Sequence, residues 1–130
     1  MGAHVLNRIL LVEDEPDIQV IAGLALEKVG NFSVEICSSA AEAIEKAPSF
    51  APDLILLDVM MPGIDGPSTL KKLRQIPQTS KTPVIFLTAK VQPPEIERYK
   101  QLGAVDVIAK PFDPMKLAAK INKIWERHRD

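Results

Sequence analysis

Apolar and polar positions along the chain predict strands and helices in strict alternation. A short apolar run over residues 8–12 ends at three consecutive acids and is typical of a strand. Over residues 16–29, apolar side chains recur at the spacing of one helix face, and Gly30 stands where the residue after a helix end belongs. Residues 33–37 are a weaker, partly polar strand candidate that suits the edge of a sheet.

The alternation continues to the end of the chain. A helix is predicted over residues 39–47, with Ser38 or Ser39 as its N-cap and Pro48 as its stop. The continuous apolar run 54–57 indicates a strand that is covered on both faces. The remaining predicted elements are a helix over about 67–75, a strand at 83–87, a helix after Pro93-Pro94 ending at Leu102-Gly103, a strand at 105–109, and a helix begun by Asp113-Pro114.

Five strand–helix pairs in 130 residues predict one α/β domain with a parallel sheet, because parallel strands need crossover connections. Right-handed crossovers and five strands together favour the doubly wound, flavodoxin-like strand order 2-1-3-4-5. We expect residues 1–7 to be a short lead-in and residues 8–130 to form the domain.

The charge balance and the cysteine count favour a cytoplasmic protein. Sixteen basic and seventeen acidic side chains leave a net charge of −1, which gives no overall signal for nucleic acid or a membrane surface. The lysines of the last helix are therefore interpreted as a solvated face. The single cysteine, Cys37, cannot form an internal disulfide and fits a reducing compartment. No secretory leader opens the chain, and no apolar run approaches the roughly 18 residues of a membrane span.

Candidate chemistry gathers at the carboxyl ends of the predicted strands, where doubly wound sheets bind ligands beside the reversal of strand order. Five polar side chains follow four of the strands: Glu13, Asp14, Asp58, Thr88 and Lys110. Three carboxylates so close together repel one another and raise one another's pKa unless a cation binds among them. Oxygen ligands favour Mg²⁺, and no histidine or cysteine nearby suggests zinc.

Each of these residues alone has an ordinary explanation. Acids at the start of a helix interact favourably with the helix dipole, which explains Glu15 and Asp17 as well as a functional role does. An aspartate after a strand is commonly a turn former. The placement at four separate strand ends favours a site. Carboxylates, a metal, a lysine and a hydroxyl together suit phosphoryl transfer, so we expect Asp58 to be a nucleophile that forms an acyl phosphate.

The sequence strongly resembles the CheY-like receiver domains of two-component signalling, over residues 8–127. Four stretches carry the resemblance: LLVEDE with its acidic pair, DVMMPGIDG from Asp58 onward, VIFLTAK around Thr88, and GAVDVIAKPF with Lys110. In combination these motifs are specific to that family.

The resemblance implies a phosphorylation switch. Asp58 would accept a phosphoryl group from a sensor histidine kinase or a histidine phosphotransfer protein, and Thr88 and Lys110 would contact that group. The Lys110–Pro111 bond would be cis. The implied Mg²⁺ ligands are Glu13, Asp14, Asp58 and the backbone carbonyl of Met60.

The resemblance also implies what the switch controls. The face formed by the fourth helix, fifth strand and fifth helix would act on an effector protein or an output domain, and a homodimer through the fourth and fifth helices is an option. Neither nucleic acid nor a membrane is an expected direct partner. We expect self-phosphorylation and slow auto-dephosphorylation, and no turnover of an outside substrate.

Three features depart from the common pattern of the family. Many relatives carry an aromatic residue where this chain has Val107, so the aromatic part of the switch is absent or replaced. Met60 and Lys90 occupy positions that govern dephosphorylation in similar domains, and the bulky Met60 predicts a long-lived acyl phosphate because it hinders an attacking water. Pro93-Pro94 resets the start of the fourth helix and predicts a longer, more mobile loop before it.

Two alternative functions stay open on the sequence alone. A pseudo-receiver would keep the fold as an interaction scaffold without accepting phosphate, although all five site residues are present. A Mg²⁺-dependent phosphohydrolase with an aspartyl nucleophile usually has a second acid two residues later, where this chain has Met60. A nucleotide or flavin site is less favoured still, because no glycine-rich turn follows the first strand.

Overall fold

The structure is a computed structural model that describes residues 5–128. Strands and helices alternate, with a π-helical turn (η1) after the first helix and a 3-10 turn (η2) before the fourth strand. No helix of the described chain is long and apolar enough to cross a lipid bilayer. In order, the elements are β1 (Arg8–Val12), α1 (Pro16–Leu24), η1 (Ala25–Val29), β2 (Ser33–Cys37), α2 (Ala40–Phe50), β3 (Leu54–Asp58), α3 (Gly66–Leu73), η2 (Pro77–Thr79), β4 (Val84–Thr88), α4 (Pro93–Gln101), β5 (Asp106–Ala109) and α5 (Pro114–His128).

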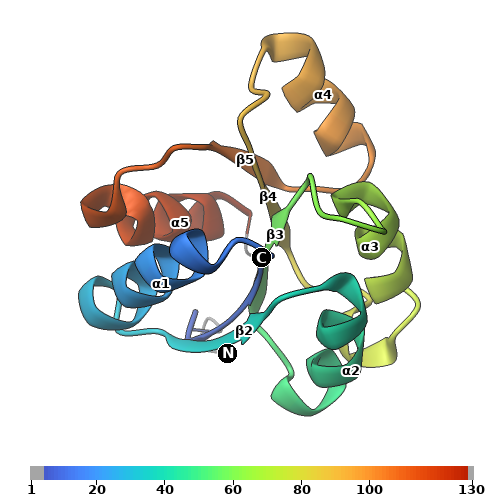
Figure 1. Cartoon of the computed structure of the whole chain (residues 1–130), viewed down its shortest axis with the longest axis horizontal. Coiled ribbons are helices and arrows are strands. Elements are labelled where there is room, and N and C mark those ends of the chain that lie inside the picture. The colour runs from blue at the N-terminus through green and yellow to red at the C-terminus, as the bar shows by residue number, and fades with distance from the viewer. Residues whose placement is uncertain (1–4, 129–130) are drawn as a thin grey trace.

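The five strands form one parallel sheet in the order β2-β1-β3-β4-β5, which confirms the predicted fold. Figure 1 shows α1 and α5 on one side of the sheet and α2, α3 and α4 on the other. The chain order reverses between β1 and β3. In sheets of this kind, ligands bind at the carboxyl ends of the strands beside that reversal.

Side chains that alternate along the strands divide the interior into two cores. Ile9 and Leu11 of β1 pack with α1 and α5 in the first core, and Leu10 and Val12 pack with α2 and α3 in the second. Strands β3 and β4 alternate in the same way, and every residue of both strands is buried. The apolar run 54–57 is therefore part of a central strand covered on both faces, as predicted.

The first helical run ends at Val29, as predicted, but Gly30 is its C-cap and the left-handed residue comes one position later. The Gly30 N–H donates to the Ala25 carbonyl at 3.1 Å, which closes a wide π turn, and it is Asn31 that takes the left-handed conformation, with φ of 59°. Asparagine tolerates that conformation better than most residues. Gly30 is needed for packing instead, because a Cβ there would lie 2.7 Å from the Phe32 ring and 2.8 Å from the Leu26 carbonyl oxygen.

Pro48 does not stop the second helix, so that prediction was wrong; α2 continues beyond it. Ser39 is the N-cap, and its hydroxyl accepts from the Glu42 N–H at 3.1 Å. Proline removes one helical N–H, yet the last turn still closes, because the Ala51 N–H donates to the Ala47 carbonyl at 2.9 Å. Burial of Ala47 in the second core favours that turn over an early stop.

The segment before β1 falls partly outside the described residues. Of the predicted lead-in 1–7, residues 5–7 are described. Leu6 is buried in the first core, and the Asn7 carbonyl accepts from the Ser33 N–H at 2.8 Å. These two contacts attach the described part of the segment to the sheet.

Asp53→Ala is expected to lower the free energy of unfolding by about 1–3 kcal/mol. One carboxylate oxygen of Asp53 accepts from the backbone N–H groups of Asn7 and Arg8, at 2.9 and 2.8 Å, and alanine removes that acceptor from both. Urea unfolding followed by circular dichroism measures the change. Asp53→Asn is the matched control, because its amide oxygen still accepts and restores part of the loss. An alanine variant as stable as the parent would contradict this role.

Candidate functional site

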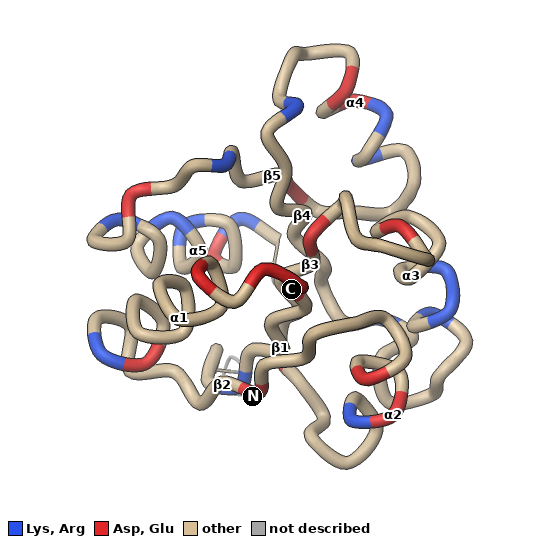
Figure 2. Tube along the Cα trace, in the orientation of Figure 1, with Lys and Arg blue, Asp and Glu red and all other residues tan. Residues whose placement is uncertain are grey.

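The polar residues predicted from the strand ends meet at the carboxyl edge of the sheet. Glu13 and Asp14 follow β1, Asp58 ends β3, Thr88 ends β4, and Lys110 follows β5. Figure 2 shows the acidic positions after β1 beside the end of β3. Glu13 and Asp58 each come one residue after a registered pair of β1 and β3, so both continue along the same face of the sheet.

Glu13, Asp14 and Asp58 form an acidic cluster. Each offers a carboxylate oxygen, and these oxygens lie within 4.8 Å of one another. Glu13 is fully buried, and Asp58 is 2% exposed. Asp14 Oδ1 and Asp58 Oδ2 are buried without a hydrogen-bond partner in the described part of the chain. Because buried carboxylate oxygens without donors cost free energy, and because all donor atoms are oxygens, the cluster fits a divalent cation such as Mg²⁺.

Lys110 supplies the positive charge at the cluster. Its Nζ lies 2.8 Å from Glu13 Oε1 and 3.2 Å from Asp58 Oδ1, with Glu15 Oε1 farther away at 3.6 Å. One ammonium group therefore faces two buried carboxylates, and the cluster keeps a net negative charge. The Lys110–Pro111 bond that follows is cis, as the resemblance implies.

Burial and charge shift the pKa values of the central pair. Burial, followed by the negative charge of Glu13, raises the pKa of Asp58 to about 7, although Lys110 and the Met60 N–H act in the opposite direction. Burial lowers the pKa of Lys110, but its hydrogen bond to Glu13 and the charge of Asp58 outweigh burial and raise that pKa overall. The lysine is charged at neutral pH, whereas the aspartate is only partly ionised without a metal.

The other predicted site residues surround the acidic cluster. Thr88 is 2% exposed, and its Oγ1 accepts from the Lys90 N–H at 3.1 Å, which holds the hydroxyl within the loop after β4. The Met60 N–H donates to Asp58 Oδ1 at 3.2 Å, while the Met60 side chain is 65% exposed. The role of the Met60 carbonyl as a metal ligand stays a prediction. Helix α4 begins at Pro93, so it includes the proline pair that the prediction placed before it.

Two residues that position the cluster were missed in the sequence. Gln19 Nε2 donates to the Glu13 carbonyl at 2.6 Å, so the first helix holds the main chain at the end of β1. This bond depends on the angle between β1 and α1, and no pattern in the sequence predicts it. No role was predicted for Gly66 beyond its place in the DVMMPGIDG motif, yet a Cβ there would lie 2.9 Å from the Asp58 carbonyl oxygen and 2.8 Å from the Val59 Cα.

Curated relatives share this sequence over most of its length. The chain is 39% identical over 121 residues to the alkaline phosphatase synthesis transcriptional regulatory protein PhoP of Bacillus subtilis, covering 93% of this chain and 49% of that protein. It is 35% identical over 121 residues to response regulator Rre1 of Synechocystis, covering 93% of this chain and 52% of that protein. The chain thus spans about half the length of the curated relatives it matches.

Solved structures and a family model agree with these relatives. Chemotaxis protein CheY4 of Vibrio cholerae superposes with a TM-score of 0.84 at 29% identity, covering 92% of this chain and 99% of that one. The signal receiver domain of a histidine kinase from Syntrophus aciditrophicus gives 0.78 at 32% identity, covering 94% and 92%. The family model described as the response regulator receiver domain matches residues 9–122. The chain therefore belongs to the response regulator receiver domain family of two-component systems.

Proposed function

We propose that the chain is a phosphorylation switch that accepts a phosphoryl group on Asp58, in a reaction that needs Mg²⁺. The donor is the phosphohistidine of a sensor histidine kinase or a histidine phosphotransfer protein, and this exchange takes place in the cytoplasm. One observation carries the proposal: three carboxylates offer oxygens within 4.8 Å of one another, with Lys110 Nζ within 3.2 Å of two of them.

The proposed metal site consists of oxygen atoms alone. When bound, Mg²⁺ neutralises the charge that gathers on the carboxylates and on the incoming phosphoryl group. The buried, unpartnered oxygen of Asp14 supports this assignment. The proposed ligands are Glu13, Asp14, Asp58 and the carbonyl of Met60.

The two carboxylate oxygens of Asp58 have different surroundings, which supports a different role for each. Oδ1 accepts from the Met60 N–H and lies 3.2 Å from Lys110 Nζ, so it is held in place. Oδ2 has no hydrogen-bond partner among residues 5–128 and is the atom free to attack phosphorus. A new P–O bond forms as the P–N bond to the donor imidazole breaks, with its electron pair left on nitrogen. Lys110 and Thr88 then stabilise the phosphoryl oxygens.

The switch reaches its output through β4 and β5. The Lys110 N–H donates to the Thr88 carbonyl at 2.9 Å, so the two residues that contact the phosphoryl group are also joined through the main chain. Movement of Thr88 toward that group pulls the loop that contains Lys90 and changes the face formed by α4, β5 and α5. That face acts on an effector protein or an output domain, and α4 and α5 can form a homodimer. With Val107 on β5, this response proceeds without an aromatic side chain at that position.

The alternative functions fit the site less well. A phosphohydrolase needs a second acid to protonate its leaving group. Here the residue two positions after Asp58 is Met60, whose side chain is apolar and 65% exposed. A pseudo-receiver that accepts no phosphate does not require the ammonium group of Lys110 between two buried carboxylates. We therefore propose a stoichiometric acceptor that turns over no outside substrate.

The acyl phosphate on Asp58 is expected to persist beyond the scale of minutes when Mg²⁺ is present. Met60 and Lys90 line one hollow of about 520 Å³ together with Val59, the residue after the acceptor, and a thioether neither orients nor activates a water. Quenched samples resolved on a phosphate-affinity gel measure the decay. Met60→Asn is the control, because a carboxamide orients water and accelerates the loss. Loss within minutes in the parent would contradict the role of Met60.

The decisive experiment is incubation with Mg²⁺ and acetyl phosphate, followed by intact mass measurement. The parent is expected to gain the mass of one phosphoryl group, and Asp58→Asn is expected to gain none. Asp17→Asn, an exposed aspartate on α1, is the matched control and reacts like the parent. Omission of Mg²⁺ abolishes the gain.

Two other results would overturn the proposal. Labelling of Asp58→Asn to the same extent as the parent would place the acceptor elsewhere. If neither acetyl phosphate nor a phosphorylated histidine phosphotransfer protein labels the parent, the chain is a pseudo-receiver.

A further inference from the structure

A hollow of about 520 Å³ lies between the loop after β3 and helix α4. This volume is within the range of pockets that bind small molecules. Two buried side chains, Val59 and Tyr99, form its floor and are 6% and 4% exposed. Met60, Met61 and Pro67 complete its apolar lining. The hollow therefore has the size and the apolar surface of a ligand pocket.

Four charged side chains border the hollow, and the two carboxylates among them are already engaged. Asp65 caps α3, where its Oδ1 accepts from the Ser68 N–H at 2.8 Å, and this bond lowers the pKa of Asp65. Glu95 lies in the first turn of α4, where its Oε1 accepts from the Gln92 N–H at 3.1 Å. Each carboxylate thus offsets the partial positive charge of one helix N-terminus.

The two cations at the hollow have no carboxylate within salt-bridge distance. Among residues 5–128, no ion pair involves Lys90 or Arg98. The guanidinium carbon of Arg98 lies 6.0 Å from the centre of the Tyr99 ring, and its charge affects the pKa of Asp65 less than the Ser68 bond does. Figure 2 shows basic positions on the loop before α4 and on α4 itself. Two positive charges therefore stand above an apolar floor.

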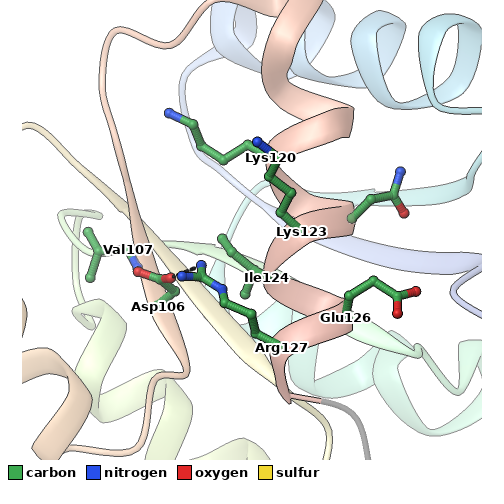
Figure 3. A pocket seen from close by; sticks show the side chains of 8 residues that line it. Asp106, Val107, Lys120, Lys123, Ile124, Glu126 and Arg127 are labelled. Atoms are coloured by element: carbon green, nitrogen blue, oxygen red, sulfur yellow. Dashed lines mark hydrogen bonds and ion pairs between the residues drawn. The ribbon is translucent and has the colours of Figure 1, made fainter.

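The groove between β5 and α5 differs in this respect. It has a volume of about 700 Å³ and belongs to the α4–β5–α5 face already proposed for output. Figure 3 shows Arg127 reaching across it to β5, where its Nη2 lies 2.9 Å from Asp106 Oδ2. The hollow beside α4 shares no lining residue with this groove, so it is a separate site.

We propose that the hollow beside α4 binds a small aromatic carboxylate. The ring of the ligand lies over Val59 and against the thioethers of Met60 and Met61, which make favourable contacts with aromatic rings. Its carboxylate pairs with Lys90 and Arg98, and a guanidinium group donates to both oxygens of a carboxylate. A ligand without a ring leaves the apolar floor in water, and a ligand without charge leaves both cations unpaired.

Two hydrogen bonds donated by the main chain connect the hollow to the phosphorylation site. The Met60 N–H donates to Asp58 Oδ1 at 3.2 Å, and the Lys90 N–H donates to Thr88 Oγ1 at 3.1 Å. When Thr88 moves toward a phosphoryl group, Lys90 moves with it and the hollow loses one of its cations. The ligand therefore binds the unphosphorylated chain more tightly, and it opposes phosphorylation by the same free energy. This coupling, unlike the binding itself, rests on the proposed function.

The test titrates the unphosphorylated full chain with 2-naphthylacetate in phosphate-free buffer and records backbone amide NMR shifts. Shifts are expected at Val59, Met60, Lys90 and Tyr99, with a dissociation constant of about 1 mM, the size expected for a ligand of about 14 non-hydrogen atoms. The uncharged 2-naphthylacetamide should bind about fivefold more weakly, because it forms neither surface ion pair. Inorganic phosphate carries charge without a ring and should shift none of these amides at equal concentration.

Charge-matched variants show where the carboxylate binds. Lys90→Gln combined with Arg98→Gln is expected to weaken 2-naphthylacetate binding about fivefold. Lys71→Gln combined with Lys72→Gln removes the same charge from exposed positions of α3 that do not line the hollow, and it should leave the affinity within about twofold.

Beryllofluoride with Mg²⁺, a stable mimic of a bound phosphoryl group, tests the coupling. Its addition is expected to weaken 2-naphthylacetate binding about fivefold, the lower end of coupling between two sites. Amide shifts at Asp58 report whether the mimic binds there. A failure of the proposed acceptor is therefore distinguished from a failure of the coupling, and binding to the untreated chain is measurable in either case.

Four results would overturn the inference. One is the absence of amide shifts at the hollow at about 10 mM 2-naphthylacetate, tenfold above the expected dissociation constant. Another is equal binding of the carboxylate and its amide, which would show that the two cations take no part. The third is an equal response to inorganic phosphate, which would make the hollow a site for bare anions. Unchanged affinity after the mimic has shifted the Asp58 amide would overturn the coupling.

Discussion

Asp58→Asn is expected to raise the free energy of unfolding of the metal-free protein by about 1–3 kcal/mol at about pH 8. Burial and the charge of Glu13 raise the pKa of Asp58 to about 7 in the folded chain, against an ordinary value of 3.8. Ionised Asp58 therefore destabilises the fold relative to the unfolded chain. Asparagine has a similar shape and no charge, so it removes this cost, although it also gives up the attraction to Lys110.

The sign of the pH dependence follows from the direction of this shift. Between about pH 4 and pH 7 the folded chain binds more protons at Asp58 than the unfolded chain does, so stability falls as pH rises through that window. Below it, both states carry a protonated carboxyl group and the charge costs nothing. The advantage of Asp58→Asn is therefore small at about pH 4 and reaches its full size above about pH 7.

Urea unfolding in the presence of a chelator at several pH values measures this effect. Glu97→Gln, an exposed carboxylate on α4, is the control and should change stability little at any pH. Millimolar Mg²⁺ should stabilise the parent more than Asp58→Asn, because the variant offers one anionic ligand fewer. An Asp58→Asn variant that unfolds at lower urea than the metal-free parent at about pH 8 would show that the carboxylates do not repel one another as described.

Lys110→Met is expected to have the opposite and larger effect, a loss of about 3–5 kcal/mol in the metal-free protein. Lys110 Nζ lies 2.8 Å from Glu13 Oε1 and 3.2 Å from Asp58 Oδ1, and both carboxylates are buried. Methionine keeps most of the side-chain stem but leaves the acids without a cation. Removing one partner of a buried ion pair costs far more than the intact pair contributes, because the remaining charge stays desolvated.

The stability loss caused by Lys110→Met should depend on both pH and Mg²⁺. The loss should shrink at about pH 5, where Asp58 is protonated, and millimolar Mg²⁺ should restore more stability to Lys110→Met than it adds to the parent. Phosphorylation by acetyl phosphate should fall sharply even with Mg²⁺, because the phosphoryl oxygens lose their ammonium partner. Lys81→Met, an exposed lysine before β4, is the control for loss of a surface charge. Equal stability of Lys110→Met and the parent without metal would contradict the role of Lys110 in balancing the cluster.

The fold could be predicted from the sequence because each strand and each α-helix has a local signal. The apolar run 54–57 is long enough for one strand and too short for a helix, and the Asp113-Pro114 pair starts α5 where predicted. Local signals failed where tertiary packing determines at which of two possible residues a helix ends. Pro48 stays inside α2 because the turn around it is buried against the second core, and the π turn before Asn31 follows from how Phe32 packs on Gly30.

The candidate site was predictable for a different reason. The carboxyl ends of parallel strands lie at one edge of the sheet. The strand order therefore predicts that Glu13, Asp58 and Lys110 lie near one another. The sequence could not predict which ion pairs these side chains form. That Lys110 lies between two carboxylates, and that Gln19 holds the main chain of Glu13, depends on side-chain directions beyond the strand ends. The cis Lys110–Pro111 bond was expected from family resemblance alone.

Gly66 leaves no free space between helix α3 and the main chain of Asp58, the proposed phosphoryl acceptor. Its N–H donates to the Val59 carbonyl at 2.8 Å, and there is no room for even one methyl group between its Cα and the main chain of Asp58 and Val59. The first turn of α3 is therefore packed directly against the main chain at the end of β3. We therefore expect a protein that binds and displaces α3 to shift the main chain at Asp58 without entering the cleft.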